Sequence, residues 1–406
     1  MATIHPFRAL RPVPARAAAV SSVPYDVVTT EEARELARNN PFSFLRVTRS
    51  EIDLPPDADP YAARVYQRAR ENFQKLRETA PLVVEDAPSL YFYRLKLGQH
   101  EQTGLAGCFS VDEYERDIIK KHERTRRDKE DDRTRHIIEL RAQTGIVFLV
   151  YRAVQEVDAV TRRVTATEPL DDFTAEDGVQ HTVWRVEGED TRTLVASFGR
   201  IPSLYIADGH HRAASAARAR DEMRGRPGVT PEVGTFIAVA FPDDQVKILP
   251  YNRTVKDLAG RTAAQFLKML RDRLPVTDGS ATPGRKGEVG MYLGGKWYSI
   301  DLTRAQPEDA SRGSSLDVAL LQRAVLEQLL SVGDVRTDKR IDFIGGARGT
   351  RALEQAVDTG KAAVAFSLFP VTIDDLMAIS DAGGIMPPKS TWFEPKLRDG
   401  LLVHLI

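Results

Sequence analysis

Apolar positions along this chain repeat alternately with the period of short strands and with that of amphipathic helices. The apolar runs predict strands at residues 91–97, 204–206, 235–241, 289–293 and 296–302. Spacings of three and four residues predict helices at about 29–40, 60–79, 213–219, 266–274 and 318–329. Strands and helices are mixed along the whole length, so we expect an α/β protein of mixed α+β character.

Local signals sharpen some of these boundaries. Thr29 with Glu32 forms a capping box that starts the first helix. Pro60 suits the first position of the second helix, and Gly294 with Gly295 suits a hairpin turn. The proline-rich end of the chain predicts an ordered loop followed by a last strand.

The chain has 406 residues, which is too long for one small core, and two or three domains are expected. We divide it into an N-terminal α/β domain at 1–105, a central core at 106–259 and a C-terminal α+β domain at 260–406. The terminal loop of the last domain is expected to return to a shared cleft.

Composition narrows the class of partner. A formal net charge of −1 provides no global field to attract nucleic acid or an anionic membrane, and we expect neither partner. No apolar run approaches a membrane-spanning length, and a single cysteine fits a reducing compartment, so we expect a cytoplasmic protein. Cys108 lies in an apolar phrase and is expected to be a buried thiol. The number of subunits stays open.

The most informative stretch is residues 204–217, LYIADGHHRAASAA, where a buried strand meets an alanine-rich helix. A helix that follows a strand presents a positive dipole end and unsatisfied N–H groups to an anion. Gly209 allows close approach, His210 and His211 donate hydrogen bonds, and Arg212 adds a guanidinium fork. The turn therefore predicts a phosphate site. As alternatives, Asp208 is only an N-cap and each histidine is a packed side chain; a metal site is disfavoured because a third ligand is lacking.

Residues 120–135, KKHERTRRDKEDDRTR, carry eight basic and five acidic side chains. Such a mixed run is either a solvated face or, since it is enclosed between two strand-like phrases, the lining of a cleft. Within it His122 and Glu123 provide a candidate general base beside phosphate-binding charge. Arg253 is a candidate second anion contact, with an exposed arginine as the alternative.

Seven phrases in one order resemble a large prokaryotic family known as domain of unknown function 1015. They are VPYDVV, NPFSFLRV, KHERTR, IADGHHRAASA, LPYNRTV, DFIGG and MPPKSTWFEPKL, spread from Val23 to Leu397. This resemblance covers nearly all of the chain and implies little about function.

DGHHR after a strand is also similar to the phosphate-binding turn of the ParB and sulfiredoxin superfamily. That resemblance implies a ParB/sulfiredoxin-like core with N- and C-terminal α/β additions. Archaeal free-serine kinases of the superfamily carry this phrase and make O-phosphoserine, while sulfiredoxins place a cysteine in the turn and ParB proteins bind CTP and DNA. This turn has no cysteine, and the near-neutral charge disfavours DNA binding.

Together these observations predict a kinase that uses ATP or ADP with Mg²⁺ and phosphorylates a small alcohol, with L-serine as the best candidate. Gly209, His210, His211 and Arg212 would hold the phosphates, with Arg253 behind them. The catalytic group would be Glu123 as base, with His122 and with Asp208 near the magnesium. Asp26 would receive the substrate amine, and Lys389 and Ser390 would contact substrate. The alternative is a ParB-like nucleotide sensor or interaction protein without turnover.

Overall fold

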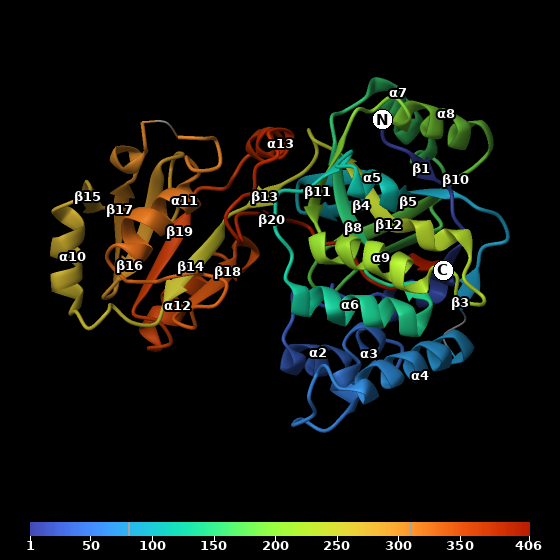
Figure 1. The fold of residues 1–406 in the computed structure, drawn as a ribbon, viewed down its shortest axis with the longest axis horizontal. Helices are drawn as coiled ribbons and strands as arrows, with labels where there is room; N and C mark the ends of the chain where they lie inside the picture. The colour runs from blue at the N-terminus through green and yellow to red at the C-terminus, as the bar shows by residue number, and fades with distance from the viewer. Residues whose placement is uncertain (80–81, 309) are drawn as a thin grey trace. The chain divides into compact units, whose positions relative to one another are not determined.

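The computed structural model describes residues 1–79, 82–308 and 310–406, and it contains two compact units. The first unit comprises residues 1–121, 125–246 and 395–406, and the second comprises 122–124 and 247–394. Both units mix helices with sheets, so the predicted α/β class is confirmed (Figure 1). The predicted boundary at residue 105 falls inside a strand of the first unit, and the second unit begins at Lys247 rather than at residue 260.

The first unit holds most of the regular elements. Its strands are β1 Ile4–His5, β2 Ala9–Pro12, β3 Leu82–Val84, β4 Leu90–Leu97, β5 His100–Ser110, β6 Ile119–Lys120, β7 Ala142–Gln143, β8 Val147–Tyr151, β9 Asp171–Thr174, β10 Gln180–Val186, β11 Leu204–Asp208, β12 Thr235–Pro242 and β21 Val403–Leu405. Its α-helices are α1 Ala17–Val20, α2 Thr30–Ala37, α3 Leu45–Thr48, α4 Ala63–Thr79, α5 Val111–Glu115, α6 Arg127–Leu140, α7 Gln155–Val164, α8 Gly188–Phe198 and α9 His210–Met223. Short 3₁₀ turns lie at Pro14–Arg16, Ser50–Asp53 and Pro231–Gly234.

A nine-stranded sheet organises this unit. Its strand order is β6-β11-β8-β12-β5-β4-β10-β9, and β1 pairs with β5 outside that order. Most neighbours are antiparallel, but β11 is parallel to β6 and β12 is parallel to β8. The strands β8 and β12 consist almost entirely of buried apolar residues, as their β-branched and aromatic sequences predict.

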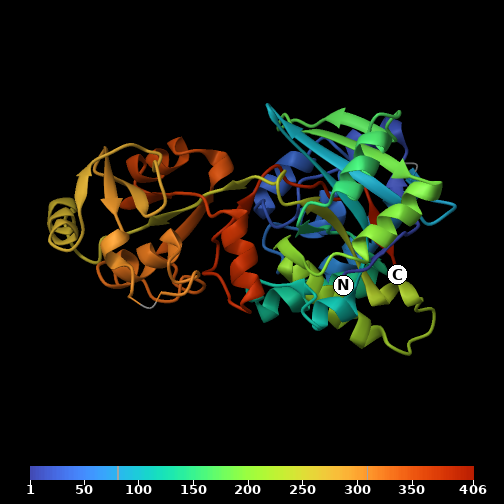
Figure 2. The same ribbon diagram turned by 90° about the horizontal axis from the view of Figure 1, so that it is seen from above.

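A second sheet of the same unit joins distant parts of the chain in the order β3-β2-β21-β7. The last strand, β21, pairs with β2 near the N-terminus and with β7 (Figures 1 and 2, red beside blue). Phe73 and Leu76 of α4 pack beneath this sheet in one apolar cluster with Val403. The C-terminal segment is therefore part of the first unit's core.

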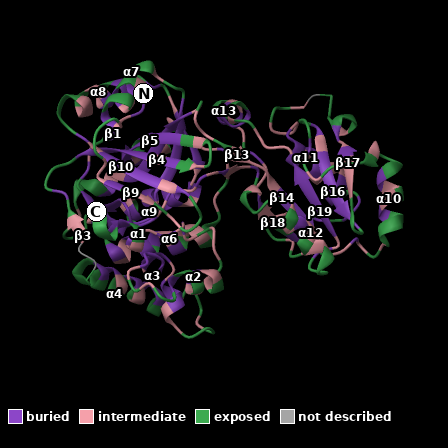
Figure 3. Ribbon diagram, turned by 180° about the vertical axis from the view of Figure 1, so that it is seen from behind, coloured by how far each residue is buried: buried purple, intermediate pink, exposed green. Residues whose placement is uncertain are grey.

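The core of the nine-stranded sheet is formed by its own side chains and by α7, α8 and α9. Figure 3 shows that the buried residues gather on the strands of the sheets in both units. Cys108 is fully buried on β5, as the sequence predicts. Among the helices that the structure describes, none has the length and apolar character needed to cross a bilayer.

The second unit is built on a six-stranded sheet with the order β15-β17-β16-β19-β14-β18 and a two-stranded pair of β13 and β20. Its strands are β13 Ile248–Leu249, β14 Tyr251–Val255, β15 Val276–Asp278, β16 Glu288–Leu293, β17 Lys296–Asp301, β18 Ile341–Gly345, β19 Val364–Leu368 and β20 Trp392–Phe393. Its helices are α10 Ala263–Arg271, α11 Asp317–Leu321, α12 Arg351–Asp358 and α13 Ile373–Asp381, with 3₁₀ turns at Thr303–Ala305 and Gly346–Arg348 and a π-helical turn at Gln322–Glu327.

Local sequence signals have mixed outcomes. The capping box of Thr29 and Glu32 is formed, and the hairpin across Gly294 and Gly295 joins β16 to β17. The prediction that Pro60 opens a helix is wrong: α4 begins at Ala63, because the Asp59 carboxylate accepts the Tyr61 N–H and closes a turn first. The helix predicted over 318–329 changes to a π-helical turn after Leu321.

Candidate functional site

The predicted phosphate turn lies where β11 ends and α9 begins. Gly209 is the N-cap residue of the helix, with φ of +95°, and as a glycine it has no side chain to cap the helix. Asp208 is the last residue of β11, so it is not the N-cap that the alternative interpretation required. The positive end of the fourteen-residue helix α9 therefore follows directly after a buried strand.

A lysine that sequence reasoning did not single out reaches this turn. Lys396 Nζ donates to Asp208 Oδ2 at 2.8 Å, and both side chains are partly exposed, at 18% and 29%. Lys396 comes from the phrase WFEPKL, whose only sequence signal is its place among the phrases of the family resemblance. The turn thus has a cation on a partly exposed carboxylate next to the helix end.

Arg212 is placed differently from the prediction that it forks onto a phosphate. Its side chain is buried, Nη1 donates to Ile146 O at 2.6 Å, and Nη2 donates to both carboxylate oxygens of Asp26 at 2.8 Å. Burial is the largest single influence on the pKa of Arg212 and lowers it. The charges of Asp26 and of other acidic neighbours together outweigh burial, so the pKa lies above its usual value. The structure therefore brings the predicted site residues Asp26 and Arg212 together, and it pairs them with each other rather than leaving Arg212 available to a phosphate.

The position of Arg212 depends on two glycines. A Cβ on Gly209 would lie 3.2 Å from Arg212 Cδ and 3.3 Å from Val147 Cα, and a Cβ on Gly145 would also lie 3.2 Å from Arg212 Cδ. A side chain at either position would therefore crowd the Arg212 side chain at Cδ.

Two guanidinium groups lie close to the ring of Tyr25. The Cζ atoms of Arg133 and Arg212 are 4.3 and 5.4 Å from its ring centroid. Burial, followed by the nearby Asp26 charge, raises the pKa of Tyr25 to about 12, so the phenol stays protonated. Sequence reasoning assigned the substrate amine to Asp26 but gave no role to the neighbouring tyrosine.

Arg133 shows what the charged run 120–135 becomes. Residues 127–140 form α6, which packs beside α9 (Figure 1), and Asp132, Thr134 and His136 on this helix are buried. Part of the run therefore faces inward rather than water. A small cavity of about 370 Å³, including open solvent at its mouth, lies here within the first unit. It is lined by Tyr25, Arg133, His136, Ile137, Gln143, Thr144, Gly145, Val147, Arg212, Phe236 and Ile237.

Asp399 is a third residue that the sequence gave no reason to select. It is 1% exposed, and its Oδ2 has no hydrogen-bond partner. Burial raises its pKa to about 7, while the Arg212 charge and the Tyr25 N–H act in the opposite direction. A carboxyl group that titrates near neutral pH therefore lies close to the Asp26–Arg212 pair.

The two histidines of the turn differ in environment. His210 is 6% exposed, whereas His211 Nε2 accepts the Arg126 N–H at 3.0 Å. Because an N–H donates to Nε2, the neutral His211 ring carries its proton on Nδ1. His122 and Glu123 belong to the second unit, where the Met386 N–H donates to His122 O at 2.8 Å. Their convergence with the turn stays a prediction.

Three other predicted residues come together in the second unit. Arg253 Nη2 donates to Pro388 O at 3.3 Å and Nη1 to Tyr251 O, and burial lowers the pKa of Arg253 to about 9. Lys389 has a φ of +56°, and its Nζ lies 5.3 Å from the Tyr251 ring centroid. Ser390 Oγ donates to Pro387 O at 2.5 Å. Arg253 is therefore buried rather than exposed, and the substrate roles of Lys389 and Ser390 stay predictions.

Solved structures with a partial likeness to the chain share little sequence with it. A truncated SbnI from Staphylococcus aureus is 13% identical with a TM-score of 0.40, and the match covers 74% of this chain and 87% of that one. A free serine kinase in complex with AMP is 14% identical with a TM-score of 0.37, over 73% and 91% of the two chains. A conserved hypothetical protein from Pyrococcus furiosus is 15% identical with a TM-score of 0.37, over 74% and 95%. At these TM-scores the likeness carries no argument about activity.

No protein of curated function matches the sequence. The sequence profile described as "Protein of unknown function (DUF1015)" matches residues 4–319, well over half of the chain. The chain therefore belongs to the DUF1015 family, as its seven phrases predicted.

Proposed function

We propose that the turn from Asp208 to Arg212 binds the phosphates of ATP or ADP, and that the protein transfers a phosphoryl group to a small alcohol, with L-serine as the best candidate. The observation that carries this proposal is the start of α9 at Gly209, directly after β11, with the Lys396 ammonium on the adjacent Asp208. A helix start of this kind favours an anion, and a flexible ammonium binds phosphate as a point charge.

Asp208 and Lys396 fit a site that exchanges one cation for another. Mg²⁺ prefers oxygen ligands and binds through one or two carboxylates together with phosphate oxygens. It would neutralise the negative charge of the phosphoryl group during transfer. Asp208 supplies such a carboxylate, which the Lys396 ammonium neutralises in this structure. When the metal–nucleotide complex binds, Lys396 would move from Asp208 to a phosphate oxygen, and the carboxylate would hold the metal.

Arg212 acts in this proposal as a positioning residue. Its bonds to Asp26 and to Ile146 O fix the Tyr25–Asp26 segment near the start of α9. The side chain of Asp26 is 38% exposed, and a carboxylate has more acceptor positions than the two that Arg212 uses. Asp26 therefore keeps the capacity to receive the ammonium group of an amino-acid substrate.

Glu123 is proposed as the base that takes the proton of the acceptor hydroxyl, with His122 beside it. Support comes from the sheet of the first unit, where β6 is parallel to β11 with Ile119 opposite Leu204 and Lys120 opposite Tyr205. Parallel neighbours end at the same edge of a sheet, so β6 ends at the edge where β11 leads into the turn, and Glu123 follows three positions after β6 in the sequence.

The alternative function, nucleotide sensing without turnover, is favoured by a different feature. The guanidinium nearest to the turn is already neutralised by Asp26, which leaves less positive charge to stabilise a phosphoryl group in transfer. A sensor needs only ground-state binding, which the helix start and Lys396 supply.

Binding is tested by titrating the full chain with ATP and with ADP, each with magnesium, by calorimetry. Lys396→Met should weaken binding about 10- to 100-fold, the scale of one lost charge-assisted hydrogen bond to phosphate. Lys96→Met, which removes a half-exposed surface ammonium paired with Glu101, is the matched control and should bind as the unmodified chain does. Absence of nucleotide binding by the unmodified chain, or equal affinity of the Lys396 variant, would contradict the proposed site.

A further inference from the structure

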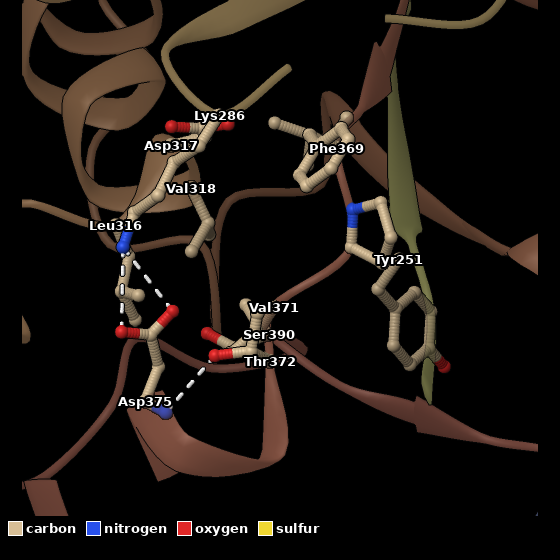
Figure 4. Close-up of a pocket in the computed structure, with 12 residues that line it drawn as sticks. Tyr251, Lys286, Leu316, Asp317, Val318, Phe369, Val371, Thr372, Asp375 and Ser390 are labelled. Atoms are coloured by element: carbon tan, nitrogen blue, oxygen red, sulfur yellow. Dashed lines mark hydrogen bonds and ion pairs between the residues drawn. The ribbon is translucent and has the colours of Figure 1, made fainter. Parts of the chain in front are cut away.

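The second unit contains a cavity of its own, with about 480 Å³ of empty space including open solvent at its mouth (Figure 4). Its lining residues are Tyr251, Lys286, Leu316, Asp317, Val318, Leu368, Phe369, Pro370, Val371, Thr372, Asp375 and Ser390. Half of them are aliphatic, proline or phenylalanine side chains. Figure 4 shows Lys286, Asp317 and Val318 on one side and Phe369 with Tyr251 on the other. The cavity therefore combines an apolar wall with a wall that carries charge.

One of its two carboxylates is fully compensated. Asp375 is 3% exposed, Lys286 Nζ lies 3.1 Å from its Oδ2, and Arg312 Nε donates to its Oδ1 at 2.7 Å. Its own N–H donates to Thr372 Oγ1, which caps α13. Two cations thus hold this carboxylate, and the pairs link two loops to the start of the helix. We assign Asp375 a structural role.

The other carboxylate, Asp317, is less completely compensated. Asp317 is 6% exposed, and its Oδ1 accepts the Gly287 N–H at 2.8 Å. Within the described residues of the second unit, no lysine or arginine forms an ion pair with it. Burial raises the pKa of Asp317 to about 6, although the Gly287 N–H and the charges of Lys286 and Arg285 act in the opposite direction. A carboxylate in this state gains from any ligand that supplies a positive charge or a strong donor.

We propose that this cavity binds a small molecule that carries a protonated amine on an apolar body, with Asp317 as the counter-ion. The ammonium donates to the Asp317 oxygen that Gly287 does not use, and the apolar body packs between Val318, Phe369 and Val371. This site lies wholly in the second unit and does not depend on the proposed phosphate turn.

An anion is a poorer occupant for a simple reason of charge. Lys286 and Arg312 already share the charge of Asp375, so an incoming anion would face Asp317 without a free cation to hold it. A neutral apolar molecule would fill the space but leave Asp317 uncompensated. A protonated amine on an apolar body would pair with Asp317 and also pack against the apolar side chains.

The test uses four ligands of similar carbon skeleton with the full chain: isopentylamine, isopentyl alcohol, isovalerate and leucine. Binding is measured by calorimetry and by the rise in melting temperature at millimolar ligand. Isopentylamine should bind at least tenfold more tightly than the alcohol and the acid. Leucine decides between two sources of the same ammonium: tighter binding than isopentylamine identifies amino acids as the ligand class, and weaker binding identifies simple amines.

Two variants separate charge from space. Asp317→Asn should reduce amine binding at least tenfold, and Val371→Trp should block the cavity while leaving Asp317 in place. Asp342→Asn, which removes an exposed carboxylate of the same unit, is the matched control and should bind like the unmodified chain. If isopentylamine does not bind, binds no better than the alcohol, or keeps its affinity in both cavity variants, the proposal is overturned.

Discussion

Gly209 provides a direct test of how the turn is built, because two glycines of the first unit both have a positive φ but differ in surroundings. Gly209 has a φ of +95°, and a Cβ there would meet Arg212 Cδ at 3.2 Å and the Val147 backbone at 3.3 Å. Gly225 has a φ of +76° and nothing within 4 Å of the corresponding position. Substitution by alanine at Gly225 therefore measures the conformational cost alone.

For Gly225→Ala we expect a loss of about 1 to 2 kcal/mol in the free energy of unfolding, the usual cost of left-handed backbone for a residue with a Cβ. For Gly209→Ala we expect about 2 to 5 kcal/mol, because contacts of 3.2 to 3.3 Å in packed surroundings add an overpacking cost of about 1 to 3 kcal/mol. The assay is urea denaturation followed by circular dichroism, comparing the transition of the first unit, which contains both residues. Equal losses in the two variants would refute the close packing of Gly209 against Arg212.

Three further predictions concern buried groups of the first unit. The pKa of Asp399 is raised from 3.8 to about 7, so the folded state holds the proton more tightly than the unfolded state, and stability falls as the pH rises between these values. Asp399→Asn should therefore remove a slope of about 1.4 kcal/mol per pH unit from the free energy of unfolding in that pH range, as measured by urea titrations. An unchanged slope would place that titration elsewhere. His181→Phe should cost about 1 to 3 kcal/mol of stability, because the Tyr93 hydroxyl loses its 2.9 Å partner, and a neutral result would mean that the hydrogen bond contributes nothing. Cys108 should react with a thiol reagent only in denaturant, since it is fully buried with a raised pKa; rapid labelling of the native chain would contradict this burial.

Local structure was predictable where neighbouring residues determine it. The capping box at Thr29 satisfies two backbone groups within four residues, and the glycine pair at 294–295 permits the hairpin turn, so both follow from short sequences. The strand β12 was recognised because all of its residues after Thr235 are buried. In each of these cases the physical cause lies inside the predicted element.

The contacts of the candidate site could not be predicted in the same way. Asp26 and Arg212 are 186 positions apart, and Asp208 and Lys396 are 188 positions apart. From the sequence alone, Arg212 and Lys396 could each have paired with any of the many acidic residues, because ion pairs between distant residues leave no periodic pattern in the sequence. The return of the C-terminal segment to pair β21 with β2 also leaves no local signal. Sequence patterns identified the turn itself, whereas its partners required the fold.

The central claim, phosphoryl transfer at the turn before α9, is tested most directly by product formation. The full chain is incubated with magnesium and either ATP or ADP in the presence of L-serine, with a panel of other amino alcohols, and phosphorylated acceptor is measured by mass spectrometry. We predict O-phosphoserine from the unmodified chain, with turnover about 10²- to 10⁴-fold lower in Glu123→Gln and nucleotide affinity retained. If nucleotide stabilises the protein but no phosphorylated acceptor forms, the kinase proposal is contradicted and the nucleotide-sensor alternative is supported.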